Sequence, residues 1–129
     1  MLALDTSAVL RLILGEPAPL AEAAREVLLQ ARRDGDAVII TDTVVGEAFF
    51  ALQNHYDMPE TEVLRALHAL LQSGLVVPEP AALVGAFAHE GGGGFMDRLI
   101  NARHRAIGAT TLTFDGKMAR LSGAKRLSL

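Results

Sequence analysis

Four acidic residues stand at widely separated points of this 129-residue chain, each where a strand is expected to end or where the helix after a strand is expected to begin. They are Asp5, Glu47, Asp97 and Asp115. In a parallel α/β sheet, such positions face the edge formed by the carboxyl ends of the strands, where ligands bind. We therefore expect the four carboxylates to converge at this edge.

A cluster of carboxylates requires a positive charge, because like charges held close together repel one another. The chain contains no cysteine, which excludes disulfides and thiolate-bound metals. Oxygen ligands favour a hard divalent cation such as Mg²⁺ or Mn²⁺, and Mg²⁺ is commonly bound by a few carboxylates together with substrate phosphates. The four acids therefore predict one or two such ions and chemistry on phosphoryl groups.

Each acid taken singly also has a structural interpretation. Asp5 is suited to cap the helix that follows it, and Asp115 stands in a turn. Glu47 and Asp97 can complement the dipoles of their helices. A purely structural role is less favoured for Asp5 and Asp115, because apolar residues flank both. We expect Asp5 in particular to lie in the interior, where an ionised carboxylate needs a partner.

The elements that must position these acids alternate along the chain. Strands are expected at about 2–4, 37–40, 75–77, 109–113 and 126–128, and helices at about 6–14, 18–33, 44–55, 60–73, 81–89 and 96–107. This alternation predicts one domain over residues 1–129, an α/β sandwich with a mostly parallel sheet. Four consecutive glycines at 91–94 predict a hinge or a tight loop before the last of these helices.

The net charge of −3 conceals a division along the chain. Residues 1–96 hold 13 acidic and 5 basic side chains, whereas residues 97–129 hold 2 acidic and 7 basic ones. The C-terminal quarter is therefore a candidate surface for phosphates, or simply a solvated basic face. The apolar runs are too short to span a membrane and no secretory signal is recognisable, so we expect a soluble, cytoplasmic protein.

Four segments resemble the PIN-domain ribonucleases, specifically the VapC-like toxins of bacterial toxin–antitoxin pairs. They are LALDTSAVLRLI, TDTVVGEAFFAL, GFMDRLINARHRAIGATTLTFDGKMARL and the closing AKRL. The resemblance runs from Asp5 to the C-terminus and implies a PIN-like α/β/α sandwich with a central, mostly parallel sheet. The GGGGF loop before Asp97 and the presence of Arg98 after it depart from the usual pattern.

The resemblance implies an endoribonuclease in which the same four acids bind the metal and carry out catalysis, namely Asp5, Glu47, Asp97 and Asp115. Mg²⁺ or Mn²⁺ would activate a water for in-line attack on the phosphorus and stabilise the leaving 3′ oxygen. Thr6 and Thr113 match hydroxyl residues that support the metal ligands or contact phosphate, although a helix cap and an ordinary strand residue are equally compatible with the sequence. Arg98 and Lys117 are candidates for contact with RNA.

The resemblance also implies partners besides the RNA substrate. These are a second copy in a homodimer and a cognate antitoxin whose C-terminal segment covers the active-site groove. The helices expected at 18–33 and 44–55 are candidate walls of that groove, and Phe49, Phe50 and Leu52 are expected to be core or dimer contacts. Structural or surface roles are expected for the histidines, which are His55, His68, His89 and His104.

Other functions compete with this interpretation. A non-catalytic PIN-like scaffold would bind RNA or a protein without cutting, although the complete set of four acids argues against it. A phosphoryl-transfer α/β protein, such as a receiver or an aspartyl-phosphate phosphatase, also places an aspartate at a strand end. Receivers have adjacent acids and the phosphatases have Asp-x-Asp, whereas this chain has Asp-Thr-Ser at 5–7. A nuclease that acts on DNA is compatible with the sequence as well.

Overall fold

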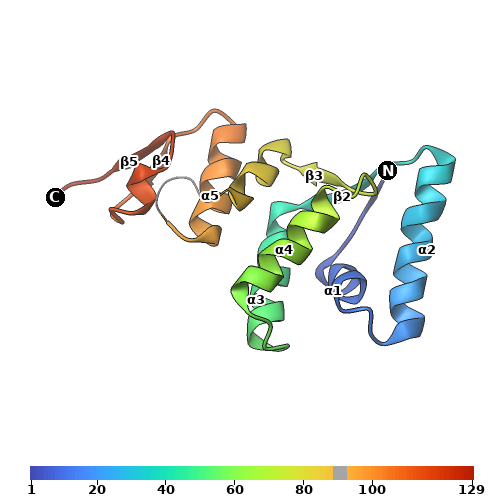
Figure 1. The fold of residues 1–129 in the computed structure, drawn as a ribbon. Coiled ribbons are helices and arrows are strands. Elements are labelled where there is room, and N and C mark those ends of the chain that lie inside the picture. The colour runs from blue at the N-terminus through green and yellow to red at the C-terminus, as the bar shows by residue number, and fades with distance from the viewer. Residues whose placement is uncertain (89–92) are drawn as a thin grey trace. The chain divides into compact units, whose positions relative to one another are not determined.

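The strands of the described chain all pair in parallel and belong to two small sheets (Figure 1). The first sheet has the order β1-β2-β3 and contains β1 (Leu2–Ala3), β2 (Val38–Thr41) and β3 (Val77–Glu79). The second joins β4 (Thr111–Thr113) to β5 (Ala124–Arg126). Parallel neighbours require crossover connections, which the intervening helices and turns provide. The α/β class with parallel pairing that the sequence predicts is thereby confirmed.

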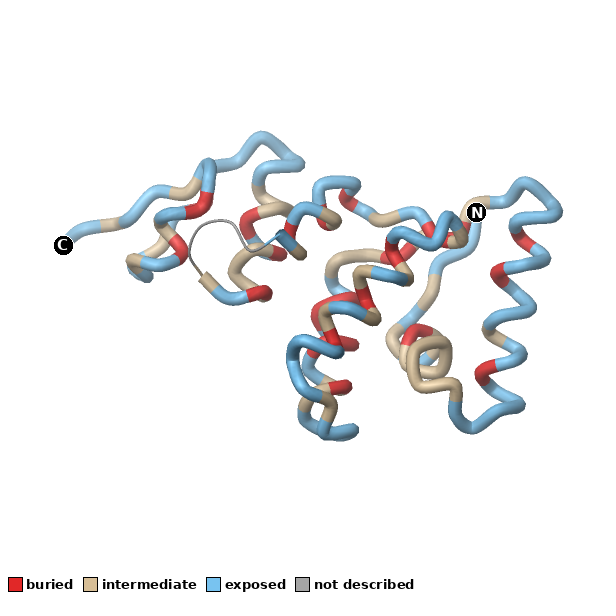
Figure 2. The backbone as a smooth tube through the Cα atoms, viewed as in Figure 1, coloured by how far each residue is buried: buried red, intermediate tan, exposed pale blue. Residues whose placement is uncertain are grey.

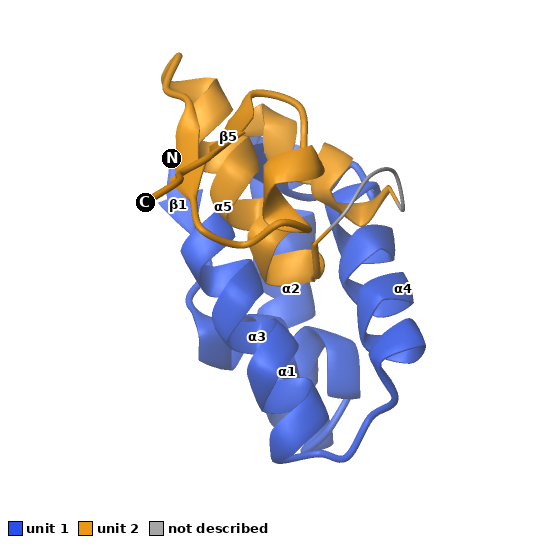
Figure 3. Cartoon of the chain, turned by 90° about the vertical axis from the view of Figure 1, so that its left-hand side faces the viewer, with its two compact units in different colours: residues 1–79 blue, residues 80–129 orange. Residues whose placement is uncertain are grey.

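The computed structural model of the chain describes residues 1–88 and 93–129. The chain divides into two compact units, unit 1 (Met1–Glu79) and unit 2 (Pro80–Leu129), which are coloured separately in Figure 3. Each unit contains one of the two sheets and is described by itself below. The single domain predicted for residues 1–129 stays a prediction.

Unit 1 consists mainly of four helices: α1 (Thr6–Leu14), α2 (Ala18–Asp34), α3 (Asp42–Asn54) and α4 (Glu60–Leu71). α1 packs against α2 and α3, and α3 packs against α4. Apolar residues at helical spacing supply the buried faces, which Figure 2 marks along these helices. The largest fully buried side chains of the unit are those of Val9, Leu28, Ile40, Val45, Leu52, Val63 and Leu67.

Unit 2 is built around α5 (Phe95–Ala106), which packs against the 3₁₀ helix η1 (Ala81–Phe87). A second 3₁₀ helix, η2 (Met118–Arg120), connects β4 to β5. The rings of Phe87 and Phe95 lie with their centroids 4.8 Å apart and join η1 to α5. The apolar core of the unit comprises Leu83, Ala86, Phe95, Leu99, Met118 and Leu121.

The predicted helices agree with the observed ones to within about two residues, but two strands are displaced. The strand predicted at 75–77 is found at Val77–Glu79, and the one predicted at 126–128 is found at Ala124–Arg126. Val76 is buried in the core just before β3 begins, whereas Val77 is exposed and pairs with β2, so burial and pairing do not coincide along this apolar run. The register with β2, in which Ile39 lies opposite Val77, sets where β3 starts.

Part of the glycine-rich loop lies outside the described residues. Gly91 and Gly92 are not described and neither is His89, whereas Gly93 and Gly94 are. Among the helices of residues 1–88 and 93–129, none has the length and apolar character needed to cross a membrane.

Candidate active site

Asp5 lies two residues beyond β1 and caps the N-terminus of α1. Its Oδ1 atom accepts hydrogen bonds from the Ser7 hydroxyl at 2.7 Å and from the Ala8 N–H at 3.0 Å. The Ala8 N–H, and after it the Ser7 hydroxyl, lower the pKa of Asp5 below its ordinary value of 3.8, so the carboxyl group is ionised at neutral pH. Asp5 is exposed, and the prediction that it lies in the interior is wrong.

The reason for this error is the short strand before Asp5. β1 has only two residues, both exposed, and it is an edge strand of its sheet. Leu2 has 44% of its surface exposed, so an apolar residue at this point of the chain does not mark the interior. The partners that Asp5 needs are supplied by the first turn of α1.

Glu47 lies in the second turn of α3, between the buried residues Gly46 and Ala48, and its own side chain is exposed. Its Oε1 atom accepts a hydrogen bond of 3.1 Å from the hydroxyl of Thr6. Because Thr6 directly follows Asp5, this bond brings two of the four predicted acids to the same end of α1. The contact joins residues 41 positions apart in the chain and gives Thr6 a supporting role beside both acids.

Asp97 is the third residue of α5, and its carboxylate points back towards the start of the helix. Its Oδ2 atom accepts a hydrogen bond of 3.2 Å from the N–H of Gly94. This is half of a capping box, because a glycine has no side chain to return the bond. Gly93 has a φ of 78°, and a Cβ atom at that position would lie 3.0 Å from the Asp97 Cβ and 3.1 Å from its Oδ2. The last glycines of the loop therefore make room for the Asp97 carboxylate.

Asp115 lies two residues beyond β4, in the same position relative to its strand as Asp5 has relative to β1. Its Oδ1 atom accepts hydrogen bonds from the N–H of Lys117 at 2.7 Å and from the N–H of Met118 at 3.3 Å. Its own N–H donates to the hydroxyl of Thr113 at 2.9 Å. Thr113 thus holds the backbone of Asp115, and Asp115 holds the turn that leads into η2.

The four carboxylates share one feature: one oxygen is held by the chain, while the other accepts no hydrogen bond from any described residue. The unused oxygens are Oδ2 of Asp5, Oε2 of Glu47, Oδ1 of Asp97 and Oδ2 of Asp115. Carboxylates that bind metals are usually oriented by such hydrogen bonds from their surroundings. Asp5 thus caps its helix and Asp115 holds its turn as the structural interpretation predicts, whereas Asp97, expected only to complement the helix dipole, accepts the Gly94 N–H; an oxygen stays available at each.

The structure joins these acids only in part. Asp5 and Glu47 belong to unit 1 and are connected through Thr6, whereas Asp97 and Asp115 belong to unit 2 and are each held by their own backbone. Within residues 1–88 and 93–129, no three His, Cys, Asp or Glu side chains form a group that could hold a metal ion. Convergence of all four stays a prediction.

The two basic residues predicted to contact RNA differ in their surroundings. Arg98 is half-buried, with its Nε donating to the carbonyl of Ala86 at 2.7 Å and its Nη1 to the carbonyl of Gly93 at 3.1 Å. It therefore ties α5 to η1 and to the glycine-rich loop. Lys117 is exposed, and its backbone N–H is the group that binds Asp115.

The described histidines occupy the structural or surface positions expected of them. His55 follows the last residue of α3, and His68 lies in the last turn of α4. The Nδ1 atom of His104 lies 2.8 Å from the hydroxyl of Thr111. Thr111 and Asn101 are buried polar residues that the sequence reading did not single out. On the buried side of α5, Asn101 lies among apolar residues. A polar residue at such a position in the sequence would have indicated it.

Comparison with known proteins identifies one family. The PIN domain family matches residues 2–124 of the chain. No curated protein and no solved structure matches it.

Proposed function

The chain belongs to the PIN domain family, whose members are generally nucleases, and from this premise we propose that it is a metal-dependent endoribonuclease of the VapC-like toxin type. The α/β/α fold of the family agrees with the helices and parallel strands of both units. The observation that carries the proposal is the way in which each of the four predicted acids is held. Each is oriented through one oxygen and offers the other to a ligand.

The chemistry of these groups suits a hard divalent cation, since the donors are carboxylate oxygens and the chain has no thiol. In the proposal the unused oxygens hold Mg²⁺ or Mn²⁺, one ion or two. They are those of Asp5, Glu47, Asp97 and Asp115. When bound, the metal supplies a water activated for attack and charge stabilisation at the scissile phosphate.

The residues of the chain orient the reaction. Thr6 holds Glu47 through its hydroxyl, and the Ser7 hydroxyl and Ala8 N–H hold Asp5, so both carboxylates of unit 1 keep a defined direction. An ionised carboxylate among the four accepts the proton of the attacking water. The displacement does not use the RNA 2′-hydroxyl, so the products carry 5′-phosphate and 3′-hydroxyl ends.

The proposed partners are RNA, a second copy of the chain and a cognate antitoxin. Exposed apolar side chains on α2 and α3 support protein contacts at these helices, because apolar surface of this kind is available for burial by a partner. They are Leu20, Val27 and Leu29 on α2 and Phe50 on α3. Of the residues expected to be core or dimer contacts, Phe49 and Leu52 are buried in the core.

Metal binding by variants that each lack one carboxylate charge tests the proposal. Calorimetric titration with Mn²⁺ should show binding to the wild-type chain and at least about tenfold weaker binding to Glu47→Gln, because the amide removes one charged ligand. Glu22→Gln is the matched control, since Glu22 is another exposed glutamate on a helix of unit 1. Equal affinities for all three proteins would show that Glu47 binds no metal.

Mapping of the RNA ends separates the nuclease from a scaffold. Cleavage in Mn²⁺ that leaves 5′-phosphates supports the proposal. Binding of RNA without any cleavage in either metal would favour the scaffold, and cleavage of DNA in preference to RNA would correct the substrate.

A further inference from the structure

Unit 2 contains a pocket of about 720 Å³ formed by η1, α5 and the segment around Leu121. Three arginines line it, together with the polar residues Asn101 and Ser122. Most of the remaining lining residues are alanine and glycine, and none of the described residues that line it is acidic. The arginines are Arg98, Arg105 and Arg120.

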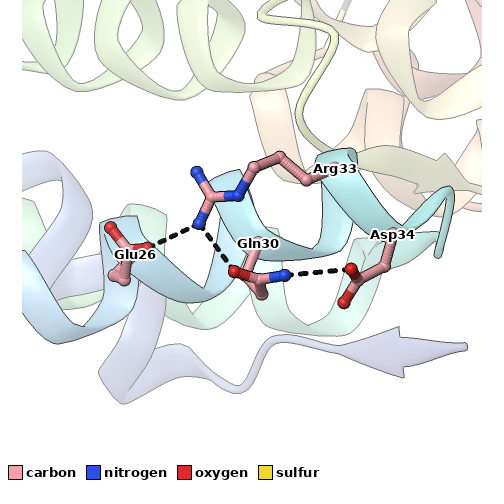
Figure 4. A network of polar contacts seen from close by, with 4 residues as sticks. All are labelled: Glu26, Gln30, Arg33 and Asp34. Atoms are coloured by element: carbon pink, nitrogen blue, oxygen red, sulfur yellow. Dashed lines mark hydrogen bonds and ion pairs between the residues drawn. The ribbon is translucent and has the colours of Figure 1, made fainter.

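The positive charge of these arginines is not neutralised by the described chain. Among the described residues, the acceptors of Arg98 are carbonyl oxygens, and none of the three arginines forms an ion pair with a described carboxylate. Arg33 on α2 shows the contrasting case, because its guanidinium binds Glu26 and Gln30 at 2.7 Å each (Figure 4). The pocket therefore gathers guanidinium groups, two of them on exposed residues, that an anion can bind.

Two features constrain two of these arginines, Arg98 and Arg105. The carbonyls of Ala86 and Gly93 fix the direction of Arg98, whose guanidinium carbon also lies 5.9 Å from the centre of the Phe95 ring. The stem of Arg105 lies across Gly123, where an added Cβ atom would be 3.3 Å from the Arg105 Cγ. Arginines whose direction is already set lose less freedom when they bind a ligand.

A buried polar network joins the walls of the pocket. The side-chain nitrogen of Asn101 donates to the carbonyl of Ser122 at 2.9 Å, and its oxygen accepts from the Thr111 hydroxyl at 2.8 Å. Because that hydroxyl gives its only hydrogen to Asn101, the Nδ1 of His104 must be the donor in the 2.8 Å contact with Thr111. The network ties α5 to β4 and to the Ser122 segment, so the pocket has fixed walls.

We propose that this pocket binds phosphate groups of an RNA strand, an inference that rests on the proposed function and names where in unit 2 the substrate is held. The paired N–H donors of a guanidinium group match pairs of phosphate oxygens. The volume of the pocket is in the range of ordinary ligand sites. The small side chains of Ala82, Gly85 and Ala102 let a backbone come close to the arginines. An acidic peptide fits less well, because Leu121 is the single large apolar residue among the described lining residues and peptide binding usually needs apolar anchors.

Binding to RNA in EDTA tests the proposal without any cleavage. The full chain is titrated into a fluorescein-labelled single-stranded RNA of about 12 nucleotides and followed by anisotropy at several salt concentrations. Arg105→Ala and Arg120→Ala should each weaken binding by about tenfold and lower the salt dependence by about one counterion. Lys125→Ala is the matched control, because Lys125 is an exposed cation of unit 2 outside the pocket, and it should change affinity by less than about twofold. Circular dichroism confirms that each variant is folded. The variants Arg105→Lys and Arg120→Lys keep the charge but lack the paired N–H donors of the guanidinium group, so they separate the two contributions.

Further arms identify the source of the phosphate. If RNA with a 5′-hydroxyl and RNA with a 5′-phosphate bind with equal affinity, the pocket holds internal phosphates. If the 5′-phosphate raises the affinity of the wild type but not that of the arginine variants, the pocket holds the terminal phosphate. The proposal is overturned if Lys125→Ala weakens binding as much as the pocket variants do, if the wild type does not bind RNA, or if a polyglutamate peptide displaces RNA as effectively as unlabelled RNA. Cleavage in Mn²⁺ is measured separately. If RNA binding depends on the pocket but no cleavage occurs, the nuclease proposal alone is refuted. If the pocket variants still cleave RNA and bind it with wild-type affinity, the pocket proposal alone is refuted.

Discussion

The two units of the molecule carry opposite net charge. Unit 1 has 12 acidic and 5 basic residues, whereas unit 2 has 3 acidic and 7 basic ones. In unit 1, Arg33 is bound by Glu26, and Arg11 donates to the carbonyl of Glu16 and to the Tyr56 hydroxyl. In unit 2, the three arginines of the pocket have no described carboxylate partner. Unit 2 is therefore the more basic part of the chain, and it contains the pocket that the three arginines line.

The acids differ between the units as well. In unit 1, Glu47 depends on a side-chain contact with Thr6, which is distant in the sequence. In unit 2, Asp97 and Asp115 are held by backbone N–H groups within three residues of themselves. Glu47 therefore depends on how α1 and α3 pack, whereas Asp97 and Asp115, like Asp5 in unit 1, depend on local turns. The Thr6→Val and Thr113→Val substitutions exploit this difference.

Asn101→Leu should have the largest effect on stability. The leucine would leave the Ser122 carbonyl and the Thr111 hydroxyl without their buried partner, which costs about 1–3 kcal/mol in the free energy of unfolding. Chemical denaturation followed by circular dichroism measures it. Gln30→Leu, which removes an exposed amide from α2, should change stability by no more than about 0.5 kcal/mol. A loss as small as that control would show that the buried network does not hold unit 2 together.

Much of the architecture was predictable from local signals, and most of the side-chain contacts were not. Helix ends near Gly15 and Gly108 and the placement of acids just after strands follow from turn chemistry and periodicity. The bond between Thr6 and Glu47 depends on how α1 meets α3, which no local pattern encodes. The basic character of the C-terminal quarter was visible as composition. That Arg105 and Arg120 line one pocket follows only from the packing of η1, α5 and the Ser122 segment.

Thr6→Val should weaken Mn²⁺ binding by about tenfold, because the isosteric side chain removes the only hydrogen bond that a described residue donates to Glu47. Thr113→Val should have a smaller effect, of about threefold or less, because Asp115 keeps its bonds to two backbone N–H groups. Calorimetric titration compares the two variants directly. Equal losses would contradict the distinction between packing-dependent and locally held acids.

Ser7→Ala should have the smallest effect, a rise in the pKa of Asp5 towards 3.8 that stops short of it. The Ala8 N–H, the larger cause of the lowered pKa, is retained in this variant. A carboxyl group with a lowered pKa stabilises the folded chain above the pKa of the unfolded state, and this contribution is lost as the pH falls through the folded-state pKa. The variant should therefore lose that contribution at a higher pH. Carbon NMR titration of Asp5 measures the pKa, with Asp36, whose pKa is lowered by the Met1 amine, as the unaffected internal control.

The most direct test of the central claim uses one acid from each unit. A mixed RNA pool is incubated in Mg²⁺ or Mn²⁺ with the wild type, with Asp5→Asn and with Asp97→Asn. The asparagines nearly preserve side-chain size, and an amide oxygen can still accept the local hydrogen bonds that Asp5 and Asp97 accept. The account predicts metal-dependent cleavage by the wild type, with 5′-phosphate ends, and a loss of at least about a hundredfold in both variants. Undiminished cleavage by either variant would contradict the proposal that Asp5 and Asp97 both hold the metal.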